Sequence, residues 1–190
     1  MIIILMGVTG CGKTTVGRLL AEDLGWTYFD ADDLHSEVNL EKMKSGTPLS
    51  DADRTPWLER LRELVRDCLL RSENAVLACS ALKESYRAFL LLDESVKLVY
   101  LKGEYQVIQE RLAQRRGHYM DPALLDNQFE TLEEPAECLW IDAASDPIAI
   151  LRTIRSSLSI SSRLNVPATV GCSGKTSEPA AHKNGRRVGT

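Results

Sequence analysis

The stretch MIIILMGVTGCGKTT, residues 1–15, constrains the fold and the chemistry of this chain more than any other. Residues 2–5 are apolar and mostly β-branched, and this run has the length of a buried strand. Gly7 then opens the pattern G-x-x-x-x-G-K-T, which closes at Thr14. The stretch therefore predicts a strand, a phosphate-binding loop and the start of a helix, which carries an apolar stripe and stops at Gly25.

The spacing of this pattern follows from the chemistry of phosphate binding. The glycines let the backbone curl with its N–H groups turned inward, and the helix N-terminus adds its positive dipole. Lys13 then reaches the β- and γ-phosphates, and the Thr14 hydroxyl is a ligand for Mg²⁺. An ordinary glycine-rich turn would not need Lys-Thr at its end. We predict that the nucleotide phosphates are bound by Gly7, Val8, Thr9, Gly10, Cys11, Gly12, Lys13, Thr14 and Thr15.

The composition is that of an ordinary globular chain, and its 190 residues suffice for one domain with a sizeable core. The apolar N-terminus lacks a basic segment and is too short for a signal peptide, and no stretch is long enough to span a membrane. We therefore expect a cytoplasmic protein with no membrane partner. The five cysteines lack C-x-x-C spacing, which indicates neither a disulfide framework nor a zinc site.

Residues 159–190 differ from the rest of the chain. They are rich in small and polar residues, lack apolar periodicity, and carry five basic residues against one acidic residue, a net charge of +4. We expect them to form a disordered basic tail. Residues 1–158 hold 18 basic and 26 acidic residues, a net charge of −8. This acidic domain argues against nucleic acid as a partner.

Short apolar runs alternate with helical patterns along residues 1–158. Further strands are predicted at residues 26–29, 75–79, 96–101 and 138–141. A polar helical segment ends at Lys44, and Thr55-Pro56 is interpreted as the N-cap and first residue of the next helix. Other helices are predicted at about residues 82–92, 104–115, 122–132 after Asp121-Pro122, and 147–158 after Asp146-Pro147.

This alternation predicts an α/β fold, a five-stranded parallel sheet with helices on both faces. Ligands of such sheets bind at the carboxyl ends of the strands. The phosphate loop follows the first predicted strand, Asp30 to His35 follow the second, and Ser80 to Lys83 follow the third. These polar segments are therefore expected at one edge of the sheet.

Two aspartates at the end of the second strand suit a kinase. Asp30 and Asp32 are placed to hold Mg²⁺ and to orient a substrate hydroxyl. The alternative is that these aspartates only cap the following helix, an interpretation that we apply to Asp33. His35 is a candidate donor to substrate oxygens or a structural hydrogen-bonding residue. Arg54 offers a fork for a carboxylate, with a solvated surface charge as the alternative.

The segment RLAQRRGHYM, residues 111–120, places arginines on the last turns of a helix that Gly117 breaks. Arginines on a mobile segment over a phosphate site stabilise charge on the transferred group and exclude water when the segment closes. An arginine-rich helix C-terminus also simply offsets the helix dipole. In the company of a phosphate loop and an aspartate pair, we predict a mobile lid over about residues 116–121.

From residue 2 to about 158 the chain resembles the gluconokinases of the shikimate-kinase-like P-loop group. The resemblance rests on these segments, in this order: GVTGCGKTTVGRLLAEDLGW, DADDLH, KMKSGTPLSDADRTPWL, CSALKESYR, RGHYM and QFETLEEP. It implies a three-layer P-loop kinase domain over residues 1–158 that transfers the γ-phosphate of ATP to the 6-hydroxyl of D-gluconate. It also implies Mg²⁺ as a cofactor and, since family members often form dimers, a homodimer.

The resemblance also assigns roles to individual residues. It makes Lys13 catalytic, Asp32 the base or hydroxyl-orienting residue, and Thr14 and Asp30 the metal residues. Arg115 and Arg116 would stabilise the transferred charge, and Arg111 would contact the nucleotide. The resemblance places the substrate among Asp32, His35, Arg54, Ser80, Lys83, Arg87, His118 and Gln128. Ser is more usual than Cys11 and Thr14 at those positions, and Cys11 introduces an oxidation liability beside the phosphates.

The sequence leaves two alternative functions open. The first is a kinase of another small hydroxy acid such as shikimate, although shikimate kinases usually carry Gly-Gly-Gly where this chain has Cys79-Ser80-Ala81. The second is a regulatory module that binds ATP without transferring phosphate, which the presence of Lys13 and Asp32 disfavours. A GTPase is disfavoured because the chain has no Asn-Lys-x-Asp guanine signature.

Overall fold

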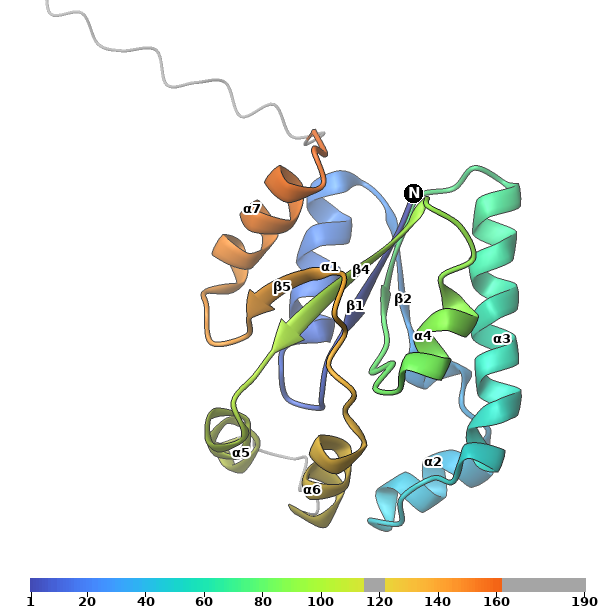
Figure 1. Ribbon diagram of the computed structural model, residues 1–190, viewed down its shortest axis with the longest axis vertical. Coiled ribbons are helices and arrows are strands. Elements are labelled where there is room, and N and C mark those ends of the chain that lie inside the picture. Colours follow the sequence, from blue (N-terminus) through green and yellow to red (C-terminus); the bar gives the residue numbers. More distant parts are fainter. Residues whose placement is uncertain (115–121, 162–190) are drawn as a thin grey trace, which may run out of the picture.

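The computed structural model describes residues 1–114 and 122–161, and five parallel strands form its centre (Figure 1). The strand order across the sheet is β2-β3-β1-β4-β5. The strands are β1 (Ile2–Met6), β2 (Thr27–Asp30), β3 (Ala75–Ala78), β4 (Val96–Lys102) and β5 (Leu139–Asp142). Each of the predicted strands is present, with ends that differ by one residue. The predicted five-stranded parallel sheet is therefore confirmed.

Helices cover both faces of this sheet and complete the three layers that were predicted. α1 (Lys13–Leu24) and α7 (Pro147–Ser157) lie on one face, and α3 (Asp51–Leu70) and α4 (Glu84–Leu90) lie on the other. Beyond the carboxyl ends of the strands lie α2 (Glu37–Lys44), α5 (Tyr105–Gln114) and α6 (Pro122–Thr131) (Figure 1). None of the helices in the described ranges is both long and apolar enough to cross a membrane.

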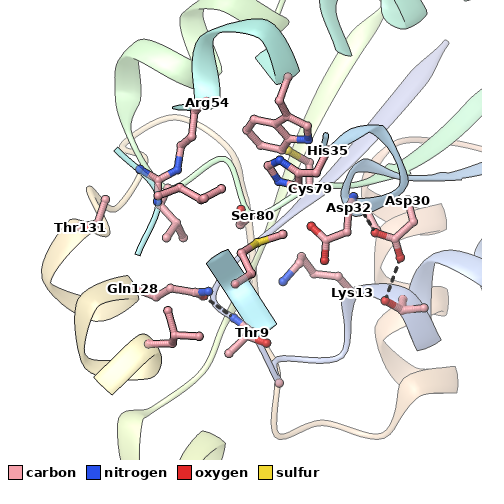
Figure 2. A pocket seen from close by; sticks show the side chains of 18 of the residues that line it. Thr9, Lys13, Asp30, Asp32, His35, Arg54, Cys79, Ser80, Gln128 and Thr131 are labelled. Atoms are coloured by element: carbon pink, nitrogen blue, oxygen red, sulfur yellow. Dashed lines mark hydrogen bonds between the residues drawn. The ribbon is translucent and has the colours of Figure 1, made fainter. Parts of the chain in front are cut away.

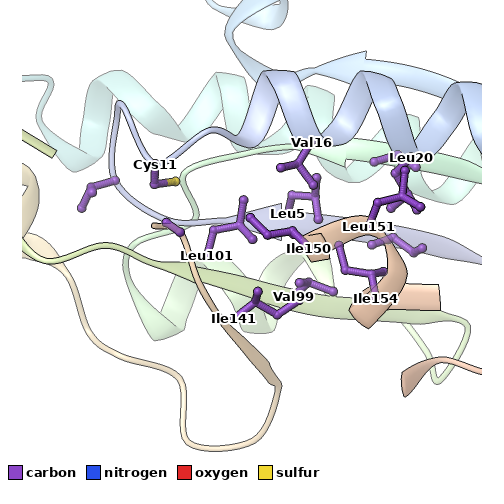
Figure 3. Packing of buried hydrophobic residues seen from close by; sticks show 14 of the residues in the cluster. Leu5, Cys11, Val16, Leu20, Val99, Leu101, Ile141, Ile150, Leu151 and Ile154 are labelled. Atoms are coloured by element: carbon purple, nitrogen blue, oxygen red, sulfur yellow. The ribbon is translucent and has the colours of Figure 1, made fainter. Parts of the chain in front are cut away.

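The central strand β1 divides its side chains between two cores. Ile3 and Leu5 pack with α1 and α7, where Leu20, Leu151 and Ile154 close the cluster (Figure 3). The alternate residues of β1 pack on the other face with α3 and α4. Because successive side chains of a strand point to opposite faces, a run of apolar residues is required only where both faces are covered. The uninterrupted apolar sequence of β1 is therefore a consequence of its central position.

The helix boundaries confirm one sequence interpretation and correct another. Gly25 ends α1 in a left-handed conformation with φ 64°, as predicted. The helix α3 begins at Asp51, so the interpretation of Thr55-Pro56 as its start is wrong. Ser50 and Asp53 form a capping box in which each side chain accepts a hydrogen bond from the other's backbone N–H. This cap stabilises one more turn than was expected and leaves Pro56 inside the helix.

Two sequence predictions fall outside the described part of the chain. The predicted lid over residues 116–121 lies in the gap between the two described ranges. The predicted tail, residues 159–190, is described only as far as residue 161. Both stay predictions.

The packing of α1 against the sheet leads to a test of stability. A Cβ atom at Gly17 would lie 2.7 Å from the ring of Tyr28 and 3.3 Å from the side chain of Leu5. Ala usually stabilises a helix relative to Gly. We expect Gly17→Ala to lower the free energy of unfolding by about 1–3 kcal/mol, because overpacking outweighs helix propensity here. Urea unfolding measures the effect, with Glu22→Ala on the exposed side of α1 as the control. A stabilised Gly17→Ala variant would contradict the packing argument.

Candidate active site

A cavity of about 400 Å³ opens at the carboxyl edge of the sheet, where the sequence predicted the site (Figure 2). The phosphate loop forms one wall, the segments after β2 and β3 form the floor, and α2, α3 and α6 supply the remaining walls. The predicted site residues that line it are Thr9, Gly10, Gly12, Lys13, Thr14, Thr15, Asp30, Asp32, His35, Arg54, Ser80 and Gln128. The fold therefore brings most of the predicted site together in one space.

The phosphate loop is shaped as an anion cradle. Gly7 and Gly12 have φ values of 141° and 98°, and a Cβ at Gly7 would lie 2.6 Å from the Leu101 carbonyl oxygen. No side chain caps the N-terminus of α1, so its first N–H groups face the loop. Lys13 Nζ donates to the carbonyl oxygens of Gly7 and Val8, both at 2.9 Å. Backbone donors, a helix dipole and one ammonium group therefore converge here, which fits a polyphosphate.

Thr14 and Asp30 form an oxygen pair beside this cradle. The Thr14 hydroxyl donates to Asp30 Oδ2 at 3.2 Å, and the Tyr28 hydroxyl donates to the same oxygen at 2.9 Å. Hydroxyl and carboxylate oxygens are the ligands that Mg²⁺ prefers. No group of three His, Cys, Asp or Glu side chains within the described ranges could hold a metal alone. The pair therefore fits a magnesium ion that takes its other ligands from phosphate and water.

Asp32 stands between the phosphate cradle and the rest of the cavity, with its carboxylate directed toward Lys13 (Figure 2). Its pKa is raised, first because surrounding protein atoms displace water from the carboxylate and second because the Asp30 carboxylate is near. The charge of Lys13 opposes this shift. The side chain keeps an exposed surface toward the cavity, so a substrate hydroxyl can reach it.

The interpretation of Asp33 as a helix cap is wrong. Asp30 accepts the hydrogen bond from the backbone N–H of Asp32 at the start of a short 3₁₀ turn, residues Ala31–Leu34. Ser36 caps α2 and accepts from the N–H of Asn39. Asp33 is exposed and does not line the cavity.

His35 is held as a neutral ring on the wall opposite the phosphate loop. It stacks on Trp57 with ring centroids 4.5 Å apart and an angle of 7° between the planes. Burial, followed by the nearby charge of Arg54, lowers the pKa of His35 to about 4. Trp57 is 4% exposed, and its indole N–H donates to the Ala31 carbonyl at 2.7 Å. It is also part of the cavity wall.

Arg54 reaches the cavity from the first turns of α3, and a cluster of polar groups surrounds it. Asp51 accepts hydrogen bonds from Lys83 at 2.7 and 2.8 Å and from the Tyr86 hydroxyl. Arg54 Nη1 lies 3.8 Å from Asp51 Oδ1, and its guanidinium lies 6.0 Å from the Tyr86 ring centroid. Lys83 was predicted to line the substrate pocket. It is instead paired with Asp51 and is not among the residues that line the cavity. Neither Asp51 nor Tyr86 was predicted from the sequence as part of the site.

Arg87 was predicted to bind substrate, but the structure places it behind the loop that follows β3. The residue is 6% exposed, and its Nη1 donates to the carbonyl oxygens of Ala81 and Leu82 at 3.1 and 2.9 Å. Ala81 has φ 43°, a left-handed conformation that costs energy for a residue with a Cβ. Arg87 therefore holds a strained loop in place, and does not line the cavity.

The helix α6 touches the phosphate loop directly, which no local signal indicated. Gln128 Oε1 accepts a hydrogen bond from the Thr9 backbone N–H at 2.7 Å (Figure 2). Beyond α6, Glu133 accepts from the backbone N–H of Glu84 at 2.6 Å and so caps α4, where Lys83 supplies no side-chain cap. This segment therefore connects the phosphate loop with the loop after β3.

The remaining predicted residues lie away from the cavity or outside the described ranges. Cys11 is 1% exposed and packs in the core beneath the phosphate loop (Figure 3), and this burial opposes the predicted oxidation liability. Arg111 Nη1 donates to the Ala143 carbonyl at 2.7 Å and joins α5 to the turn after β5. Arg115, Arg116 and His118 lie outside the described residues.

The chain is similar over most of its length to kinases of known families. The family model described as shikimate kinase matches residues 9–157. A probable gluconokinase from Mus musculus is 48% identical, and the match covers 71% of this chain and 83% of the mouse protein. The thermosensitive gluconokinase of Escherichia coli K12 is 45% identical, over 70% of this chain and 71% of that protein.

A solved structure agrees with these sequence matches. The crystal structure of a gluconokinase from Sinorhizobium meliloti 1021 superposes with a TM-score of 0.75 at 39% identity. The match covers 83% of this chain and 90% of that one. The chain therefore belongs to the shikimate kinase family and, within it, to the gluconokinases.

Proposed function

We propose that this protein is a kinase that transfers the γ-phosphate of ATP to the 6-hydroxyl of D-gluconate. The observation that carries the proposal is the continuity of one cavity. Its phosphate end holds Lys13 and the Thr14–Asp30 pair with Asp32 beside them, and its other end holds Arg54 (Figure 2). A phosphate donor, a reacting hydroxyl and a carboxylate thus each meet a group of suitable charge.

The residues at the phosphate end act through position and charge. ATP supplies the phosphoryl group when bound, and Mg²⁺ held at Thr14 and Asp30 offsets charge on the phosphates. Lys13 donates to the phosphates in place of its present carbonyl partners. Asp32 accepts the hydrogen bond of the substrate hydroxyl, orients its oxygen toward the phosphate, and takes its proton as the bond to phosphorus forms. Arg115 and Arg116 are proposed to stabilise the transferred charge.

The end of the cavity that holds Arg54, here called the acid end, supports an open-chain sugar acid as the substrate. Arg54 presents its guanidinium to the cavity, and a carboxylate can accept two parallel hydrogen bonds from such a group. His35 stays neutral at pH 7 and can exchange hydrogen bonds with hydroxyl groups without adding charge. The strained Cys79-Ser80-Ala81 loop differs from the Gly-Gly-Gly of shikimate kinases, which disfavours shikimate.

A substrate panel tests the proposed reaction. We expect ADP release with Mg²⁺-ATP and gluconate, and little with shikimate, other sugar acids or free sugars. Asp32→Asn should lower kcat about a hundredfold or more, because the hydroxyl loses its proton acceptor. Asp33→Asn changes the exposed neighbour and serves as the control. If the protein phosphorylates only another acid, that acid is the substrate in place of gluconate. If ATP binds but no acid is phosphorylated, the result favours a regulatory module that binds ATP without transferring phosphate.

The assignment of Arg54 has its own test. Arg54→Ala should raise the gluconate KM by about tenfold to a hundredfold and leave the ATP KM unchanged, because a charge-assisted hydrogen-bond pair to the carboxylate is lost. Steady-state kinetics with each substrate varied in turn measure both constants. Arg66→Ala removes an exposed arginine from the same helix and is the control. An unchanged gluconate KM would rule out a contact with the carboxylate.

A further inference from the structure

One face of α6 forms a wall of the cavity. The proposed phosphoryl transfer gives no role to this wall. Its lining residues are Leu124, Asn127, Gln128 and Thr131. The spacing of three and four residues places them on a single side of the helix. Three of the four are polar and uncharged. Gln128 was predicted from the sequence, whereas Asn127 and Thr131 were not.

Gln128 fixes both the position of this face and the direction of its own amide. Its Oε1 accepts from the Thr9 N–H, so its Nε2 is the end that remains to donate. This bond places the Gln128 turn of α6 beside the phosphate loop. Thr131 lies about one helical turn further along, toward the end of the cavity that Arg54 enters (Figure 2). The face therefore runs beside the path from the reacting hydroxyl to the carboxylate.

The hydroxyl of Thr131 is not used inside its own helix. Thr55 and Thr153, also helical, each donate to the carbonyl oxygen four residues earlier at 3.0 Å. Within residues 1–114 and 122–161, the Thr131 hydroxyl makes no such bond, and the Asn127 amide makes none either. Each group can both donate and accept a hydrogen bond. Such groups suit the hydroxyl groups of a ligand better than they suit its charged groups.

Other residues that line the cavity have the complementary character. Met43, Pro48 and Leu49 from the α2–α3 segment line the cavity with apolar groups, together with Trp57 and Leu82. An open-chain sugar acid has hydroxyl groups that need hydrogen-bond partners and a carbon chain that packs on apolar surface. A cavity lined by a polar helix face and by these apolar groups can satisfy both parts of such a molecule.

We propose that Asn127 and Thr131 bind the middle hydroxyl groups of the substrate and thereby select open-chain polyhydroxy acids. Thr131 takes a hydroxyl near the carboxylate, at C2 or C3, and Asn127 takes one nearer the reacting end. This inference rests on the proposed function, since it assumes the carboxylate at Arg54 and the 6-hydroxyl at Asp32. It adds the side chains that bind the substrate's hydroxyl groups between its carboxylate and its 6-hydroxyl.

Thr131→Val and Asn127→Leu test the proposal, because each keeps the approximate size of the side chain and removes its hydrogen-bonding group. Each should raise the gluconate KM by about fivefold or more and leave the ATP KM unchanged. Glu130→Ala, an exposed position on α6, is the matched control and should leave both constants unchanged. Thermal unfolding of each variant checks that the fold is retained.

Deoxy substrates separate a direct contact from a structural effect. Wild type should bind 2-deoxygluconate or 3-deoxygluconate less tightly than gluconate, and Thr131→Val should lose that preference for one of them. The substitution and the missing hydroxyl remove the same bond, so their effects should not add.

Two results would overturn the inference alone. One is a gluconate KM within twofold of wild type in both variants, and the other is a Thr131→Val variant that keeps the full preference for gluconate over both deoxy acids. A wild-type protein that does not phosphorylate gluconate would overturn the proposed function and this inference with it.

Discussion

The parallel pairing of β1 with both β3 and β4 is the constraint on which the site depends. It sets the height at which the chain leaves the sheet and enters the phosphate loop. The pairing continues past the strands, because Cys79 N–H donates to the Leu5 carbonyl and Gly7 N–H donates to the Ser80 carbonyl. β3 in turn places Asp30 opposite Ala78 through its pairing with β2. Three loops that carry chemistry are thus positioned by one set of backbone hydrogen bonds, which is why they meet at one edge.

The charged groups in and beside the cavity fall into two separate clusters. At the phosphate end, Lys13 faces Asp30 and Asp32, and at the acid end Arg54 and Lys83 share Asp51. Neutral His35 stands between them. Asp51 holds the long side chain of Lys83, and two backbone carbonyls hold that of Lys13, before any substrate arrives, so less conformational freedom is lost on binding. The separation also suits a substrate with a neutral hydroxyl at one end and a carboxylate at the other.

The sequence was sufficient for several features that depend on neighbours in the chain. The phosphate loop, the Asp30–Asp32 pair and the five strands are local patterns, and each lies where it was predicted. Contacts between distant segments could not be predicted in this way. Gln128 and Thr9 are 119 residues apart, and the partner of Arg87 is a strained backbone rather than a ligand. The prediction of where α3 starts was wrong for another reason. Two valid helix-start signals lie five residues apart, and the capping box outweighs the proline.

The segment from α6 to Glu133 explains how one wall can serve both ends of the cavity. Gln128 binds the phosphate loop, while Glu133 accepts from Glu84 N–H and donates its own N–H to the Leu82 carbonyl. Arg87 holds the same loop from its buried side. The loop after β3 is therefore fixed by side chains where shikimate kinases usually have three glycines. A loop held in this way keeps the acid end at a set distance from the phosphate cradle. Such a fixed distance favours substrates by the separation of their carboxylate and reacting hydroxyl.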